Sequence, residues 1–151
     1  MIDKPENLGG ITRTCEALGA FKLYVPNLRC VDNSTFKFLS VSAEKWLDMA
    51  ECSARDVPSL LKHLRSNGYQ IVGLEQTSDS RTLGNYEIEN EEFTEKTAIL
   101  LGAEKTGIPV KLLSELDYSY EIPQAGLTRS LNVHVSAAVF IWEYVRLKLK
   151  N

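Results

Sequence analysis

A polar loop lies directly before the most apolar stretch of the chain, and its residue types could do chemistry. Thr128, Arg129, Ser130 and Asn132 bring hydroxyl, guanidinium and amide groups close together along the chain. The apolar stretch 133–149 is expected to form a buried helix, and polar groups beside a rigid core are typical of binding and catalytic sites. The alternative is a solvent-facing loop whose Ser130 or Asn132 only caps the helix.

A second segment, residues 100–109, joins an apolar run to charged residues. The run is expected to form a buried strand that ends at Gly102, and Glu104 and Lys105 follow closely. Because ligands of open α/β sheets bind beyond the carboxyl ends of the strands, these side chains are candidates for a site. The alternative is a turn between a strand and a helix in which both charges are solvated.

A third segment, residues 7–14, places Gly9, Gly10 and Arg13 close together. We expect the glycine pair to lie where a loop meets a helix, so that free N–H groups at the helix start could bind an anion. Arg13 would follow within the first turns of that helix and could hold a phosphate. The alternative is a turn with a surface arginine. The segment is not a dinucleotide-binding fingerprint, because no strand precedes it and its glycine spacing differs.

The elements that must position these segments alternate between strands and helices. Apolar runs predict strands at 21–25, within 46–52, and at 70–75, 97–101 and 118–122. Helical spacing and end signals predict helices at 10–18, 33–39, 57–66, 109–116 and 133–150. This order predicts an α/β fold with a mainly parallel sheet flanked by helices, and the continuous apolar strands fit burial on both faces. The polar segments 2–10 and 76–95 are expected to be loops.

The composition limits the class of protein. A chain of 151 residues with 44% hydrophobic residues fits a single domain, residues 1–151. It has no run of about 20 apolar residues that could cross a membrane, and Met1 is not followed by the apolar core of a signal peptide. Three cysteines without metal spacing predict reduced thiols in an intracellular protein, in the cytoplasm or alternatively the nucleus. With two histidines in the chain, we expect no metal site.

The net charge of −3 does not by itself predict binding to nucleic acid. If RNA is a ligand, a local basic patch or another part of a longer polypeptide must supply the affinity for phosphate. The basic residues in predicted loops or helix starts are Lys4, Arg13, Arg81, Lys105 and Arg129. They could form one basic mouth, or they could be scattered solvated charges.

Taken together, the three segments resemble the motifs of the SpoU–TrmH family of RNA ribose 2′-O-methyltransferases, within the SPOUT superfamily. The first family motif is similar to residues 7–13, the second to 101–107 and the third to 122–133. Their order and spacing match, and the resemblance covers nearly the whole chain. Segments 41–46 and 74–77 are similar to the eukaryotic branch that methylates a D-loop guanosine of tRNA. In that branch the domain is the C-terminal part of a very long protein.

The resemblance implies a SPOUT-type fold with a C-terminal trefoil knot, and S-adenosylmethionine as the cofactor. It also implies a homodimer in which the first-motif helix and the terminal helix meet the partner. Phe140, Trp142 and Tyr144 suit such an interface, although we expect at least two of them to pack in the core. Little of the family's first strand precedes the first motif here, so a truncated first strand and an exposed sheet edge are expected.

The resemblance also assigns site residues. The catalytic group would comprise Asn7, Arg13, Glu104, Ser130 and Asn132. The cofactor would be held, largely by backbone atoms, at Thr77, Leu101, Gly102, Ile122, Gln124 and Leu131. The tRNA would contact Arg13, Lys105 and Arg129. By analogy with the family, Arg13 meets the ribose 2′-hydroxyl as the base. A guanidinium stays protonated, however, so we prefer Arg13 as a clamp for the adjacent phosphate that also stabilises charge on the 2′-oxygen.

Two other functions fit the same sequence. One is a non-catalytic RNA-binding or dimerisation module that kept the fold, which the short N-terminus and the acidic balance favour. The chain nevertheless retains all five residues of the catalytic group, which argues against it: Asn7, Arg13, Glu104, Ser130 and Asn132. The other is an α/β nucleotide-binding enzyme of a different kind. That enzyme would need a phosphate-binding glycine loop after a strand, which the sequence lacks.

Overall fold

The computed structural model of the chain describes residues 2–84, 93–104, 106–128 and 130–149. The helices are α1 (Pro5–Ala17), α2 (Ser34–Ser40), α3 (Val57–Ser66), α4 (Val110–Leu113) and α5 (Val133–Lys148). The strands are β1 (Leu23–Val25), β2 (Met49–Glu51), β3 (Gln70–Leu74), β4 (Arg81–Thr82), β5 (Thr97–Leu101) and β6 (Tyr118–Glu121). Two short 3-10 segments, η1 (Leu28–Asp32) and η2 (Ala43–Lys45), flank α2 along the chain.

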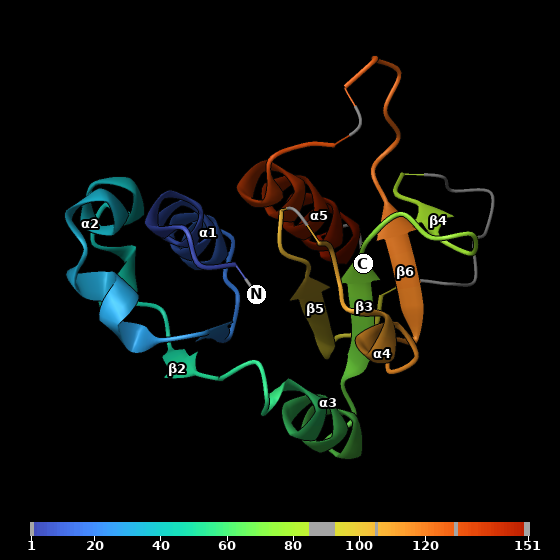
Figure 1. Cartoon of the computed structure of the whole chain (residues 1–151), viewed down its shortest axis with the longest axis horizontal. Helices are drawn as coiled ribbons and strands as arrows, with labels where there is room; N and C mark the ends of the chain where they lie inside the picture. The colour runs from blue at the N-terminus through green and yellow to red at the C-terminus, as the bar shows by residue number, and fades with distance from the viewer. Residues whose placement is uncertain (1, 85–92, 105, 129, 150–151) are drawn as a thin grey trace.

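The strands form two parallel sheets. The larger sheet has the order β4-β6-β3-β5, and the smaller one is the pair β1-β2 (Figure 1). Every strand pair in the described residues is parallel, which confirms the α/β fold with a mainly parallel sheet. In the same residues no strand precedes α1, β1 pairs with β2 alone and β5 with β3 alone. The trefoil knot stays a prediction.

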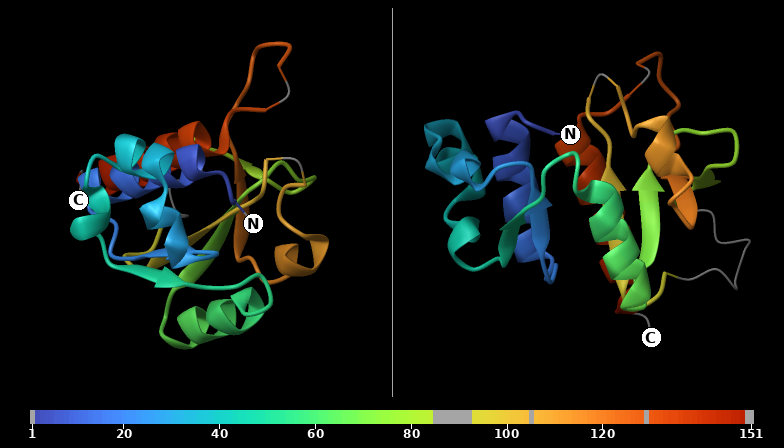
Figure 2. Two further views of the ribbon diagram at one scale, coloured as in Figure 1. Left: turned by 60° about the vertical axis from the view of Figure 1, so that its left-hand side comes forward. Right: turned by 60° about the horizontal axis from the view of Figure 1, so that its bottom comes forward.

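Helices cover both faces of the larger sheet (Figure 2). Neighbouring residues of β3 point to opposite faces, as the pleat requires. Ile71 packs with Leu61 of α3 and Leu112 of α4, whereas Val72 packs with Phe140 of α5. Helix α1 then packs on α5 from the other side, through a cluster that includes Ile11 and Cys15. The first motif, on α1, therefore lies beside the helix that directly follows the third motif.

The start of α1 differs from the prediction. The helix begins at Pro5, whose fixed φ suits a first helical turn, and the expected loop over residues 2–10 is wrong. Gly9 and Gly10 consequently lie inside the helix and cannot form an anion site at its start. Gly9 is a packing position: a Cβ there would lie 2.7 Å from the carbonyl oxygen of Phe36 in α2. Contact with α2 thus overrides the low helix propensity of glycine.

The remaining predicted elements agree with the structure within a few residues. The predicted bounds of α3 and β5 are those observed, and α5 begins after Asn132 as expected. Within the expected loop 76–95 the structure adds the short strand β4, while residues 85–92 lie outside the described part. No helix of the described residues combines the length and apolarity that crossing a bilayer requires.

Candidate functional site

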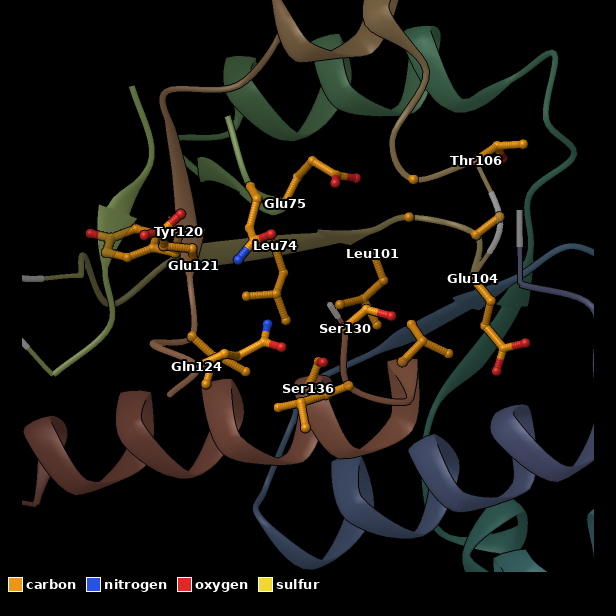
Figure 3. Close-up of a pocket in the computed structure, with 17 residues that line it drawn as sticks. Leu74, Glu75, Leu101, Glu104, Thr106, Tyr120, Glu121, Gln124, Ser130 and Ser136 are labelled. Atoms are coloured by element: carbon orange, nitrogen blue, oxygen red, sulfur yellow. The ribbon is translucent and has the colours of Figure 1, made fainter. Parts of the chain in front are cut away.

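A cavity of about 350 Å³ lies at the carboxyl ends of β6, β3 and β5, three neighbouring strands (Figure 3). Each strand contributes its last residue or those that follow it, including Glu75, Gly102 and Ile122. The start of α5 closes another side through Val133 and Ser136. This is the edge at which parallel α/β sheets bind ligands, and the volume suits a small molecule.

The loop after β5 is folded back on itself, and two glycines allow this. Ala103 and Gly107 exchange backbone hydrogen bonds of 3.1 and 2.8 Å. A Cβ on Gly102 would lie 2.5 Å from the carbonyl carbon of Gly107, so only glycine fits. Gly107 has φ of +63°, and a Cβ there would overlap the Glu75 carboxylate, which accepts a 2.7 Å hydrogen bond from the Ile108 N–H. Glu75 therefore fixes the loop from β3.

A hydrogen-bond network joins the three motifs. Asn7 donates to Oε1 of Glu104 at 2.8 Å, and Asn132 donates to Oδ1 of Asn7 at 2.9 Å and to the same Glu104 oxygen at 3.2 Å. Lys4 forms an ion pair with the other oxygen of Glu104. The hydrogen bond with Glu104, and then its charge, raise the pKa of Lys4. Asn7 is 4% exposed, so its amide holds the network rather than meeting solvent.

Asn132 also caps α5. Its Oδ1 accepts hydrogen bonds from the backbone N–H groups of His134 (2.9 Å) and Val135 (3.4 Å), which have no partner within the helix. Of the two cap candidates in the alternative interpretation of this loop, Asn132 is therefore the cap of α5. Because the amide nitrogen of the same side chain faces Asn7 and Glu104, the start of α5 is fixed to both other motifs.

Most of the residues expected at the cofactor lie around this cavity. Its lining includes Leu101, Gly102, Ile122, Gln124, Ser130 and Leu131. Ser130 lies near its centre in Figure 3, with Gln124 on one side and Glu104 on the other. Thr77 is not among the described residues that line it; its backbone forms a turn with Ser80. Lys105 and Arg129 lie outside the described residues.

Arg13 lies elsewhere. It is exposed on α1 and lines a second cavity, of about 420 Å³, with Glu6, Gly10, Thr14, Ala17, Leu18, Leu39 and His134. Glu104 lines the first cavity instead, where it binds Asn7, Asn132 and Lys4. Of the catalytic residues named from the sequence, Glu104 and Ser130 thus line the first cavity and Arg13 the second. Asn7 and Asn132 are in neither lining but bind Glu104.

The basic residues that the structure describes do not form one basic patch at the opening of the site. Lys4 is held by Glu104, and the Arg81 guanidinium stacks on the Tyr118 ring at 3.4 Å from its centroid. Arg13 is alone among the three in lining the second cavity. No group of three His, Cys, Asp or Glu side chains in the described residues is placed to hold a metal ion.

Three site residues were not recognised in the sequence. Glu75 directly follows β3, and a carboxylate at the carboxyl end of a central strand could have been predicted to line a ligand site. Ser136 lies one turn after Asn132 on the same side of α5. His134 had no signal of its own, because its position over Gly10 depends on how α5 meets α1.

The chemistry of the first cavity suits a ligand that is partly apolar and partly cationic. Leu101, Leu131 and Val133 supply apolar walls, while Glu75 and Glu121 add carboxylates. The described lining contains no basic residue.

The chain is similar in sequence to known RNA-modifying enzymes. The mouse (Mus musculus) protein tRNA (guanosine(18)-2′-O)-methyltransferase TARBP1 is 48% identical over 149 residues, which are 99% of this chain but 9% of that protein. The Thermus thermophilus tRNA (guanosine(18)-2′-O)-methyltransferase is 32% identical over 99% of this chain and 73% of its own length.

Solved structures share the fold. The SpoU methyltransferase AviRb of Streptomyces viridochromogenes, solved in complex with the cofactor AdoMet, is similar with a TM-score of 0.79 and 26% identity, over 98% of this chain and 58% of AviRb. A family model described as the SpoU rRNA Methylase family matches residues 1–142 of the chain, which include all three motifs. The chain belongs to the SpoU rRNA Methylase family.

Proposed function

We propose that this chain is an S-adenosylmethionine-dependent methyltransferase that modifies a ribose 2′-hydroxyl of tRNA, at the D-loop guanosine in position 18. The observation that carries the proposal is the network of Asn7, Glu104 and Asn132, which ties all three motifs to one cavity at the strand ends. The names of the mouse and Thermus relatives support the substrate. The chain is taken as one domain, residues 1–151, that carries the whole cofactor site.

The residues of the first cavity fit the cofactor. S-adenosylmethionine, when bound, supplies an electrophilic methyl group on a sulfonium sulfur. Glu75 and Glu121 provide negative charge for a cationic ligand, and the absence of basic residues from the described lining agrees with it. Gly102, Ile122 and Leu131 offer backbone groups, and Ser130 a hydroxyl, toward the same space. Asn7 and Asn132 act by fixing the loops that carry these residues.

Arg13 would bind the tRNA. Its guanidinium is exposed and lines the second cavity, where it can hold the phosphate next to the target ribose. Lys105 and Arg129 are proposed to add phosphate contacts. Because the net charge of the chain is −3, its affinity for RNA phosphate must come from such local basic groups.

Two copies of the chain are proposed to form the active unit. Val135, Val139 and Trp142 form an exposed apolar stripe at helical spacing on α5, with Trp142 54% exposed. Phe140 and Tyr144 instead pack in the core beside Phe93, as expected for two of the three aromatic residues. Since Arg13 lies outside the cofactor cavity of its own chain, pairing would let the Arg13 cavity of one copy meet the cofactor cavity of the other.

An intracellular site of action, in the cytoplasm or nucleus, is part of the proposal. It is supported by the three free thiols of Cys15, Cys30 and Cys52, two of them buried. Burial raises the pKa of Cys15 to about 12, which keeps that thiol protonated and unreactive.

Methyl transfer from labelled S-adenosylmethionine to an unmodified tRNA transcript tests the function. The expected product carries one 2′-O-methylguanosine at position 18, and a transcript with 2′-deoxyguanosine there should accept no label. Calorimetry with the cofactor alone separates the alternatives. A folded chain that binds tRNA but no S-adenosylmethionine would be a non-catalytic RNA-binding module instead.

A further inference from the structure

The second cavity contains a histidine that the network of the three motifs does not use. His134 follows the cap of α5 and lies over Gly10 of α1, where a Cβ would overlap atoms Nδ1, Cε1 and Cγ of the ring. A glycine within a helix costs about 0.5–1 kcal/mol relative to alanine. At Gly10 the absent side chain creates the space in which the imidazole is seated.

The two ring nitrogens of His134 have different surroundings. Nδ1 faces the backbone of α1 at Gly10, whereas Nε2 lies 3.0 Å from the hydroxyl oxygen of Thr14. Thr14 and Arg13 both line the cavity. The Thr14 hydroxyl therefore connects Nε2 to the space where Arg13 presents its guanidinium.

We propose that His134 accepts the proton of the target ribose hydroxyl, relayed by Thr14, while Arg13 holds the neighbouring phosphate. The inference rests on the proposed methyl transfer. It adds a general base, a role that the protonated guanidinium of Arg13 cannot fill. As the oxygen–methyl bond forms, the sulfur–methyl bond breaks and its electron pair stays on sulfur. The hydroxyl proton moves to Thr14 Oγ1 as the Thr14 proton moves to Nε2, leaving an imidazolium.

The groups around the ring suit this role. Burial lowers the pKa of His134 below its usual value, so the ring is neutral and ready to accept a proton near pH 7. The charged groups that line the cavity are Glu6 and Arg13 of α1, whereas α2 contributes the apolar Leu39.

The first test observes the ring directly. The chain has two histidines, and His63 is exposed on α3, so its ring signal in NMR is an internal control. A D-arm RNA oligonucleotide should shift the titration of His134 and leave that of His63 unchanged. The same RNA with 2′-deoxyguanosine at the target should give a smaller shift at His134. Equal responses of both histidines, or none at His134, would overturn the proposal.

The second test uses single-turnover methylation with His134→Gln, whose amide can still bond Thr14 but cannot accept a proton. General-base catalysis contributes about 100- to 10,000-fold, so we expect a rate at least 100-fold lower. The acid limb of the pH–rate profile should disappear, while binding of S-adenosylmethionine and of tRNA stays within about twofold of wild type. Thr14→Ser should keep most of the rate, and Thr14→Val should lose it.

The outcomes separate this inference from the function on which it rests. If wild type transfers no methyl group, the proposed function fails. If wild type is active and His134→Gln keeps its rate and pH profile, only the role of His134 fails. Should His134→Gln not fold, Thr14→Val and the RNA titration of the wild-type ring decide the matter.

Discussion

The side-chain amide of Asn132 has two structural roles, one for its oxygen and one for its nitrogen. The oxygen caps α5 and the nitrogen joins Asn7 to Glu104. Asn33 is a natural control, because its oxygen caps α2 through the N–H groups of Thr35 and Phe36 away from the cavity.

Replacing each capping residue with alanine separates the contribution of the cap from that of the bridge between Asn7 and Glu104. Asn33→Ala should lower the free energy of unfolding by about 0.5–2 kcal/mol and leave cofactor affinity unchanged. Asn132→Ala should cost about 1 kcal/mol more for the lost bridge and weaken S-adenosylmethionine binding at least tenfold. Urea unfolding and calorimetry measure both effects. Equal cofactor affinity in the two variants would remove the bridging role.

Gly10 and His134 should be energetically coupled. Alanine usually stabilises a helix interior, yet Gly10→Ala should destabilise this chain by about 1–3 kcal/mol, because the methyl group meets the imidazole. In a His134→Ala background the same change should be neutral or stabilising. A double-mutant cycle from urea unfolding measures the coupling, and additive values would show that the ring moves aside freely.

The depressed pKa of His134 also predicts how stability depends on pH. The folded chain binds a proton at His134 less readily than the unfolded chain does, so stability is complete above the unfolded pKa of about 6.5 and falls as pH drops below it. His134→Gln should reduce the loss of melting temperature between pH 7 and pH 5.

At the scale of elements, the cavity depends on the turn between β5 and α4. Gly102 has no room for a Cβ, since Gly107 and Ile108 lie directly against it. Gly126, in the loop between β6 and α5, is a matched control because a Cβ there would meet nothing within 4 Å.

Gly102→Ala should therefore open the turn and weaken S-adenosylmethionine binding by at least tenfold, a loss of about 1.4 kcal/mol or more. Gly126→Ala should bind the cofactor as wild type does. Calorimetry on both variants, with circular dichroism to check folding, measures the difference. Wild-type affinity in Gly102→Ala would mean that the turn does not shape the cofactor site.

At the scale of the whole molecule, the two cavities predict a shared active site. Val139→Glu introduces a charge into the exposed stripe of α5 and should shift the chain from dimer to monomer in light scattering. Cofactor binding should survive, because one chain supplies that cavity, while methyl transfer is lost.

Mixing two inactive variants tests the sharing directly. Gly102→Ala has a weakened cofactor site and Arg13→Ala lacks the phosphate clamp, so each homodimer should be nearly inactive at a cofactor concentration far below the Kd of Gly102→Ala. Mixed dimers that contain one intact pair of cavities should recover up to about a quarter to a half of wild-type activity, depending on subunit exchange. No recovery despite proven exchange would place both groups of residues in one chain's own site.

Local pattern and motif order by themselves determine much about this protein. The α/β order, helices α3 and α5 and a cap at Ser130 or Asn132 follow from nearby residues, because apolar periodicity and helix-end chemistry act over a few residues. The family instead came from the resemblance of three ordered motifs spread over nearly the whole chain. The grouping of Asn7, Glu104 and Asn132 was expected only through the family resemblance.

Tertiary structure decided the rest. The glycine pair became helix interior because α2 and the ring of His134 pack against it, and no local propensity contains that information. The same packing of α1 on α5 places Arg13 in the second cavity, together with His134. The sequence thus predicted which residues matter and what reaction they suit. Contacts between residues more than a hundred positions apart decided which of them share a cavity, since only the folded chain brings them within hydrogen-bonding distance.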